Sequence, residues 1–373
     1  MEKRINSDAV KSTLASMGWS QKQLAGELAV SSQAVTNWLK GVGFPRPNKL
    51  LQLATALGLG FEQLVSAPAL QPVIAYRKKG NSKTTERHLI KALAMGALLK
   101  VLAQYLPPQR ALRTQIPLPS TEYEALQKAA SDIRQEIGIG AQAVLQYNEL
   151  IDEFKRNGAV IIPVMWGSKQ RHENALHISL PEENVTFIYL NLDTYIEDFK
   201  FWMAHELAHV FTPTLAGSDD GEDFADAFAG ALLFPRELAQ RAYADAARTH
   251  SPAAEITMLR RYADEHEISL FSVFCEVRNY VRHCRLPLLR VADREIHAAR
   301  NHERGSLVSE TLFTPRPPEA GIYIAASQNI FESSFFGALH RMVRERQTGA
   351  GYIQQVLDVS MKDATAIYAE LSR

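Results

Sequence analysis

Residues 201–211 read FWMAHELAHVF, and this stretch decides how the rest of the chain is interpreted. Its apolar residues recur at helical spacing, and His205, Glu206 and His209 form the pattern H-E-x-x-H within it. Residues four apart share one face of a helix, so the two histidines can bind one metal ion together. Imidazole nitrogen suits Zn²⁺, and Glu206 can reach a metal-bound water and take its proton. The stretch predicts a catalytic zinc site, although so short a pattern also fits a helix with structural histidines.

A second segment downstream supplies candidates for a third metal ligand. Residues 219–235 read DDGEDFADAFAGALLFP, which is acidic at the front, apolar at helical spacing behind, and ended by Pro235. A helix starting near Glu222 would present a first-turn carboxylate to the first helix, and two His with one carboxylate leave a fourth zinc position open. Asp226 either holds a ligand His by its free N–H or is a solvated side chain. On spacing alone, three other carboxylates compete with Glu222: Asp219, Asp220 and Asp223.

Together the two segments resemble the ImmA/IrrE family of zinc metallo-endopeptidases. The family pattern is H-E-L-x-H followed by E-x-x-A-[ND]-x-F-A-x-x-L-L-x-P, and Ala208 replaces its usual Gly or Ser with another small residue. The resemblance implies a zincin-like fold, Zn²⁺ held by His205, His209 and Glu222, and Glu206 as the catalytic base. It also implies a protein substrate of the repressor or antitoxin type. The downstream half of the pattern is matched by Glu222, Ala225, Asp226, Phe228, Ala229, Leu232, Leu233 and Pro235.

The composition indicates a globular protein but does not identify its binding partners. The chain has 373 residues, 46% of them hydrophobic and 22% charged, which is a globular balance sufficient for two or three domains. Lys and Arg number 41 and Asp and Glu number 41, so net charge identifies no partner. Cys275 and Cys284 are the only cysteines, which implies no disulfide framework. With no apolar leader and no apolar run of about 18 residues, we expect a cytoplasmic protein without membrane segments.

Residues 7–65 have the signals of a helix-turn-helix domain. Helices are expected at 7–17, 21–28, 32–40, 50–57 and 61–65, with residues 29–31 as the short turn. The stretch resembles the Xre-type phage-repressor family, including the run LLQLATALG at residues 50–58.

In that family the third helix lies in the DNA major groove. The resemblance therefore implies that Ser32, Gln33, Thr36 and Asn37 face base edges while Lys40 faces phosphate; Gln and Asn can pair bidentately with adenine. The expected partner is double-stranded DNA. A homodimer is also expected, because repressor-like domains often act as dimers on two half-sites, although no dimerisation helix is identified. The alternative is a domain that binds protein or only dimerises.

The connector that follows is basic and then helical. A helix is expected at residues 89–105, ended by Pro107 and Pro108. The basic residues before it either contact DNA phosphates or form a solvated loop. They are Arg77, Lys78, Lys79, Lys83 and Arg87.

A small sheet is expected just before the metal-binding helix. Helices at 120–136 and 143–157 precede strands at 159–164, 177–180 and 185–190. An edge strand beside the metal of such a peptidase can bind the substrate backbone as an added strand. Four residues are candidates for stabilising the oxyanion, each with an equally available structural role: His172, His177, Tyr189 and Tyr262.

The remaining chain is expected to be helical at 237–247, 253–266 and 269–285, followed by charged and polar sequence up to Gly305. A strand pair is expected at 307–313 and 322–326, and helices at 331–348 and 353–371. This tail is interpreted as a sensory or protein-binding domain, or as a cap on the core.

These predictions define an α+β, multidomain chain. An all-α helix-turn-helix domain (1–68) precedes a basic connector and helix (69–115), a mainly helical zincin-like metallopeptidase domain with a small β-sheet (116–288), and a C-terminal α/β tail domain (289–373). The predicted function is a DNA-binding regulator fused to a zinc endopeptidase that hydrolyses a peptide bond in a specific protein. The alternative is a non-enzymatic transcriptional repressor with a structural or sensory metal site. Glu206 argues against the alternative, because a structural site needs no general base.

Overall fold

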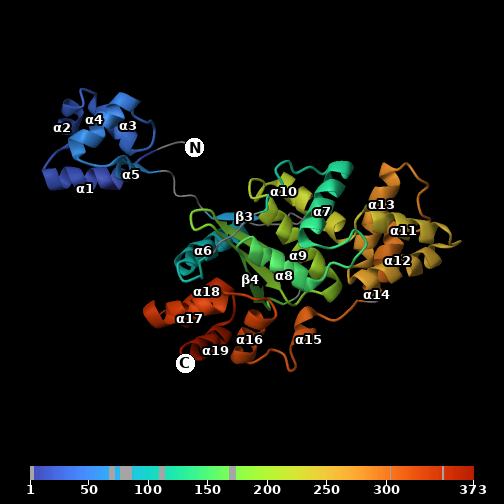
Figure 1. Ribbon diagram of the computed structural model, residues 1–373. Helices are drawn as coiled ribbons and strands as arrows, with labels where there is room; N and C mark the ends of the chain where they lie inside the picture. The colour runs from blue at the N-terminus through green and yellow to red at the C-terminus, as the bar shows by residue number, and fades with distance from the viewer. Residues whose placement is uncertain are drawn as a thin grey trace. The chain divides into compact units, whose positions relative to one another are not determined.

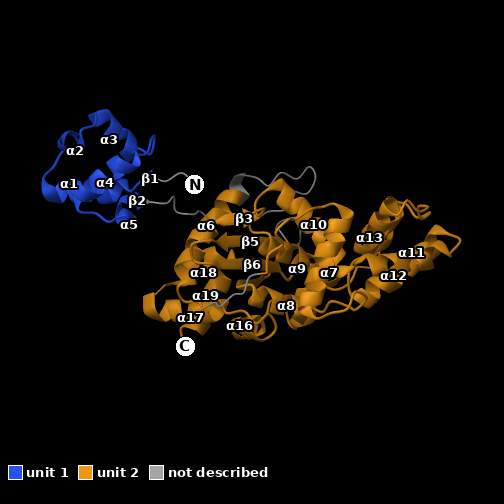
Figure 2. Cartoon of the chain, turned by 45° about the horizontal axis from the view of Figure 1, so that its top comes forward, with its two compact units in different colours: residues 1–71 blue, residues 72–373 orange. Residues whose placement is uncertain are grey.

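The chain folds into two compact units, residues 1–71 and 72–373, each with its own hydrophobic core (Figure 2). No helix of the described residues is long and apolar enough to cross a membrane. The computed structural model describes residues 4–66, 72–75, 86–108, 114–167, 174–302, 304–346 and 348–373.

The first unit is a bundle of short helices closed by a two-stranded ribbon (Figure 1). Ser20 caps the second helix in a capping box with Gln23, and Ser31 caps the third. The expected all-α unit needs one correction, because Ile5 pairs with Val65 across the ribbon and is buried in the core. The elements are β1 (Arg4–Ile5), α1 (Ser7–Met17), α2 (Gln21–Glu27), α3 (Ser32–Leu39), α4 (Pro47–Leu57), α5 (Phe61–Leu64) and β2 (Val65–Ser66).

The second unit is organised around a mixed four-stranded sheet in the order β3-β5-β6-β4. The β3–β5 and β5–β6 pairs are antiparallel, while β6 and β4 run parallel. The three strands expected before α9 are all present. The fourth strand, β3, lies in the segment that was interpreted as a connector. It was not expected, because three residues are too few to show a strand pattern. The strands are β3 (Val73–Ala75), β4 (Ala159–Val164), β5 (Ala175–Leu180) and β6 (Val185–Asn191).

Helices cover both faces of this sheet (Figure 1). His177 of β5 faces Glu206 of α9 (Ile196–Phe211), whereas the next residue, Ile178, packs against Gly96 of α6 (Glu86–Ala103). Successive residues of a strand point to opposite faces, so α9 and α6 lie on opposite sides of the sheet. Beside α9, α8 (Tyr147–Arg156) also packs on β4.

A helical layer extends from α9 on the face of the sheet that carries His177. α10 packs against both α9 and α7, and the α11–α13 group packs together and reaches α10 through α13. The helix α14 lies where only charged and polar sequence was expected. Among its described residues only Ile296 is buried, so the sequence shows no apolar helical pattern there. The helices are α7 (Tyr123–Ile137), α10 (Asp219–Leu233), α11 (Arg236–Ala247), α12 (Pro252–His266), α13 (Leu270–His283) and α14 (Asp293–His302).

The expected strand pair in the tail is wrong, since the described residues from 304 onward form helices and no strand. The apolar run at 322–326 is too short for its periodicity to separate a strand from a buried helix, and its flanking alanines favour the helix. Asp358, with φ 54°, divides the helix expected at 353–371. The helices are α15 (Val308–Leu312), α16 (Ala320–Asn329), α17 (Phe335–Arg346), α18 (Ala350–Leu357) and α19 (Met361–Leu371).

The tail is therefore helical rather than α/β, and it is bonded to the sheet. Tyr323 and Ser333 donate hydrogen bonds to main-chain carbonyls of β4, and Tyr189 of β6 donates to the carbonyl of Val356 at 2.7 Å. Residues from the ranges 69–115, 116–288 and 289–373 share one hydrophobic cluster.

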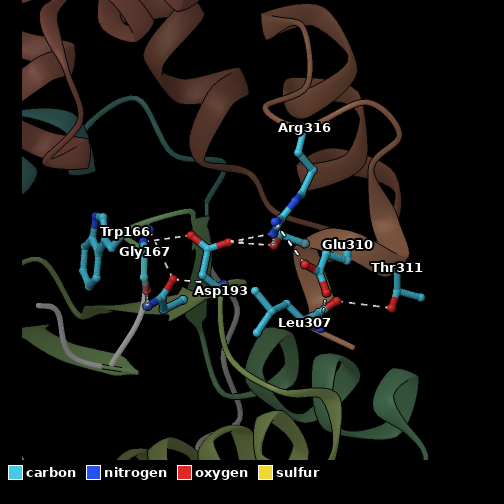
Figure 3. A network of polar contacts seen from close by, with 9 residues as sticks. Trp166, Gly167, Asp193, Leu307, Glu310, Thr311 and Arg316 are labelled. Carbon is cyan, nitrogen blue, oxygen red and sulfur yellow. Dashed lines mark hydrogen bonds and ion pairs between the residues drawn. The ribbon is translucent and has the colours of Figure 1, made fainter. Parts of the chain in front are cut away.

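A polar network also fixes the tail to the end of β6 (Figure 3). The carboxylate of Asp193 accepts hydrogen bonds from the Gly167 N–H at 2.8 Å and the Ser309 hydroxyl at 2.6 Å. Arg316 lies 3.6 Å from the same carboxylate and 3.1 Å from Glu310. The loop after β4, the loop after β6 and the start of the tail are thereby held together.

Candidate metal centre and nucleic-acid interface

The helix α9 brings the first three candidate residues together inside the second unit. The Nε2 atoms of His205 and His209 lie 3.2 Å apart, as expected for two residues one turn apart on the same face. Both side chains are 1% exposed, and Glu206 between them is 4% exposed. Trp202, which was not singled out from the sequence, packs edge-on with its ring 5.5 Å from that of His205.

The helix α10 adds one carboxylate to this pair. Glu222 places Oε1 3.3 Å from Nε2 of His209 and Oε2 3.5 Å from Nε2 of His205. One ligand atom from each of these three buried residues lies within 4.8 Å of the others. The competing carboxylates are exposed and do not join the cluster: Asp219, Asp220 and Asp223.

A tight turn positions Glu222. Ser218 caps α10 by accepting a hydrogen bond from the Gly221 N–H at 3.0 Å. A methyl group on Gly221 would lie closer than 3.0 Å to the carbonyl oxygen of Leu215, so only glycine fits there. The acidic first turn of α10 also suits the positive end of the helix dipole.

Asp226 lies one turn further along α10. Its Oδ1 is 3.0 Å from Nδ1 of His205, the ring nitrogen that does not face the other cluster members. The contact is an ion pair without regular hydrogen-bond geometry, and it lies on the side of the ring where a carboxylate that orients a metal-binding histidine would lie. His209 has no comparable support, because its buried Nδ1 has no hydrogen-bond partner among the described residues.

Of the three oxyanion candidates among the described residues, His177 lies near Glu206. Nδ1 of His177 lies 3.7 Å from Oε2 of Glu206, and its ring centroid is 5.6 Å from that of His209. Its Cα partner in the sheet is Ala75, so β3 is the edge strand beside the cluster. Tyr189 and Tyr262 bond elsewhere, to the Val356 carbonyl and to Asp245, and His172 lies outside the described residues.

The pKa values of His205 and Glu222 shift in opposite directions. Burial opposes the charged form of His205, but hydrogen bonds to Asp226 and Glu222 outweigh burial and raise its pKa to about 9. Burial likewise opposes the charged form of Glu222, yet hydrogen bonds from His205 and His209 lower its pKa to about 2. Each of the two groups therefore favours the charged form of the other.

Glu206 is shifted mainly by its surroundings. Burial raises its pKa to about 8; the positive His205 opposes this shift and the negative Glu222 adds to it. Burial lowers the pKa of His209, and it lowers that of His177 well below the ordinary value. A buried carboxylate that titrates near neutrality beside metal-type donors is typical of a reactive site.

The chemical types of the three donors, two imidazoles and one carboxylate, are types that zinc takes in proteins. Zn²⁺ with ligand bonds of about 2.0–2.1 Å keeps neighbouring ligand atoms about 3.3–3.4 Å apart. The Nε2 atoms of the two histidines lie 3.2 Å apart, and each faces a different oxygen of Glu222, at 3.3 Å for His209 and 3.5 Å for His205. One ligand atom from each of the three residues lies within 4.8 Å of the others. No other group of three such side chains converges in the described part of the chain.

The predicted nucleic-acid interface lies on α3 of the first unit. Ser32, Gln33 and Lys40 are exposed, whereas Thr36 and Asn37 are half-buried. The side-chain amide of Gln33 donates to Oδ1 of Asn37 at 2.9 Å, so the two are held together. Val35 faces the core, and α2 packs against α3. Of the basic connector, residues 77, 78, 79 and 83 and the side chain of Arg87 lie outside what the structure describes.

Comparison with known proteins supports this N-terminal assignment. Residues 10–64 match a family model described as Helix-turn-helix. Neither the curated proteins nor the solved structures contain a match to the chain. Residues 10–64 are therefore a helix-turn-helix domain of the Xre type, which supports a DNA-binding regulator.

Proposed function

We propose that the chain is a DNA-binding regulator whose second unit is a zinc-dependent endopeptidase. The observation that supports this proposal is the convergence of two buried histidines and one buried carboxylate, Glu222, beside the buried carboxylate of Glu206. The resemblance of the two helices to the ImmA/IrrE pattern supports the same conclusion.

Each residue of the cluster has a distinct role in this proposal. His205, His209 and Glu222 would hold Zn²⁺, and Asp226 would orient the ring of His205. A bound Zn²⁺ supplies Lewis-acid activation of a water molecule and of the scissile carbonyl. Glu206 accepts the proton of the attacking water and returns it to the leaving amine nitrogen. His177, beside Glu206, is the candidate donor to the developing oxyanion.

The proposed substrate is a protein of the repressor or antitoxin type, as the family resemblance implies. A helix-turn-helix domain in the same chain would bring the peptidase to the DNA where such a repressor is bound. Tethering raises the effective concentration of the substrate without any further contact.

Zinc content and proteolysis test the proposal together. Purified wild type should hold about one zinc per chain, His205→Ala should lose it, and Glu206→Gln should keep it but lose cleavage. The Glu206→Gln variant would then serve to capture the substrate. A wild type that takes up no zinc when reconstituted without chelator would refute the endopeptidase.

The low exposure of the cluster also suits a structural or sensory metal site in a non-enzymatic repressor. That alternative predicts zinc binding without cleavage. It also predicts that Glu206→Gln leaves zinc content, folding and repression as in wild type, because the proton transfer would have no role.

A further inference from the structure

A cavity of about 700 Å³ lies between α7, the loop that follows α7 and the start of α11. The helix α7 contributes Ser131, Arg134 and Gln135 to its wall, the loop contributes residues 138–141, and α11 contributes Arg236. No residue of the His205–His209–Glu222 cluster lines it. The volume is in the range of small-molecule sites, so the charges around the cavity indicate what it could hold.

Arg134 places a buried positive charge at this cavity. The residue is 1% exposed. Its Nη1 donates a hydrogen bond to the carbonyl of Leu232 at 2.7 Å, and its Nη2 donates to the carbonyls of Gly140, at 2.7 Å, and Ala143. Its Nε has no hydrogen-bond partner among the described residues. Within that part of the chain, neutral carbonyls rather than carboxylates bind this guanidinium.

The charge of Arg134 is only partly balanced within the chain. Burial lowers its pKa to about 10, and the carboxylates of Glu149 and Glu237 oppose this shift without cancelling it. A buried cation is costly unless an anion lies close to it. An anionic group in the cavity would supply the missing negative charge.

The start of α11 also favours an anion. This helix has 12 residues, and its N-cap residue, Pro235, provides no side-chain cap. The main-chain N–H of Arg236 donates instead to Oε1 of Gln127 at 2.9 Å, and the buried Nε of Arg236 has no hydrogen-bond partner among the described residues. The positive end of the helix dipole and two guanidinium groups therefore adjoin one cavity.

Nearby carboxylates do not remove this demand for an anion. Glu124 lies 2.5 Å from Nη2 of Arg236 and 2.6 Å from Nε2 of His283, so a guanidinium and an imidazole share one carboxylate. Lys128 has its own partner, Asp132, at 2.6 Å. The charged residues that line the cavity are three cations and two carboxylates: Lys128, Arg134, Arg236, Glu124 and Glu237.

We propose that this cavity binds a phosphorylated small molecule, with its phosphate group beside Arg134 and the first turn of α11. Guanidinium groups and helix N-termini are both favoured partners of phosphate in proteins. A phosphate group alone fills only a small part of the cavity, so the rest of the ligand would lie along Ser131 and Gln135, whose hydroxyl and amide groups can bind ligand hydroxyls. The inference goes beyond the proposed peptidase and does not depend on the metal centre.

Equilibrium dialysis of the full chain against radiolabelled inorganic phosphate tests the site. Wild type should bind phosphate saturably, with a Kd of roughly millimolar order for so small a ligand. Arg236→Gln should weaken binding about tenfold or more, because it removes a charged donor. The matched control is Arg248→Gln, at the residue that ends α11, where the side chain is 80% exposed and lies outside the cavity. This control should bind as wild type does, and circular dichroism should show that both variants keep their helices.

An added negative charge in the wall of the cavity gives a second test that spares both arginines. Gln135→Glu is nearly isosteric, and its charge should repel phosphate and weaken binding several-fold. Gln240→Glu makes the same change at an exposed residue of α11 outside the cavity and should leave binding unchanged. Acetate at the same ionic strength should compete poorly. The proposal would be overturned by a wild type without saturable phosphate binding, by unchanged binding in Arg236→Gln and Gln135→Glu, or by acetate that competes as well as phosphate.

Discussion

The carboxylate of Asp226 contacts one nitrogen of His205, at 3.0 Å, while the other nitrogen of that ring faces Glu222 and His209. The ring of His205 therefore has carboxylate groups next to both of its nitrogens. Fixing the tautomer of a metal-binding histidine in this way strengthens the metal site.

Asp226→Ala should lower zinc affinity about 10–100-fold, because the His205 ring loses the group that orients it. Competition with a fluorescent chelator would measure the change. The matched control is Asp223→Ala on the same helix, where the carboxylate is exposed and lies outside the cluster. Equal affinity in the two variants would contradict the role given to Asp226.

Gly221→Ala should destabilise the second unit by about 1–3 kcal/mol, because the added methyl meets the carbonyl of Leu215 and the backbone must move. Glu222 is the next residue, so zinc content should fall as well. Denaturant unfolding and metal analysis would measure the two effects. Gly140→Ala is the control, since a methyl group there has open space. A Gly221→Ala protein as stable as this control would show that the turn is not tight.

The buried carboxyl of Glu276 should make the stability of the protein depend on pH. Burial raises the pKa of Glu276 to about 8, and the nearby Asn279 and Arg278 oppose this rise. Between about pH 4.5 and 8, the folded state therefore keeps a proton on Glu276 that the unfolded state releases. Its contribution to stability therefore falls as pH rises through this range. Glu276→Gln cannot titrate, and it should gain about 2–3 kcal/mol relative to wild type between pH 5.5 and 7.5.

Unfolding free energies of both proteins at the two pH values test this prediction. All other titrating groups are shared, so they cancel in the comparison. A constant difference between wild type and Glu276→Gln would mean that Glu276 is ionised in the folded protein at both pH values.

Two substitutions, one on α3 and one at the residue that follows it, should weaken DNA binding in different ways. Gln33→Ala should cost about 1–3 kcal/mol on the preferred sequence and relax specificity, since it removes a base contact. Lys40→Ala should weaken binding to all sequences and reduce the salt slope by about 1. Binding isotherms on a selected operator and on unrelated DNA at several salt concentrations would separate the two. Lys11→Ala, exposed on α1, is the control; identical profiles for all three would argue against α3 as the reading helix.

The sequence predicted long periodic helices and buried strands well. The strand at 159–164 was expected with the bounds that β4 has, because AVIIPV is a continuous apolar run after a glycine. The helices α9 and α10 were likewise predictable, and the spacing of His205 and His209 fixed their common face. Spacing could not decide which acidic residue near the start of α10 reaches them, because that depends on how α10 rotates against α9.

Elements stabilised by distant contacts were not predictable in this way. β3 has three residues and exists because Ile74 pairs with Ile178, about a hundred residues away. The helix α16 contains IYIAA, which alone fits a strand as well as a helix, and its helical state depends on burial of Tyr323 beside Phe336 and on its hydrogen bond to β4.

The hydrogen bonds from the tail to β4 and β6 imply an order of events during synthesis. The helix-turn-helix domain has its own core and is complete when the ribosome has made its first seventy or so residues. The sheet beside the His205–His209–Glu222 cluster lacks its bond from Tyr189 to Val356 until residue 356 emerges, roughly 15–60 s later at ordinary elongation rates. A nascent chain would thus complete its helix-turn-helix domain well before the sheet that carries His177, and translational pausing would lengthen that interval.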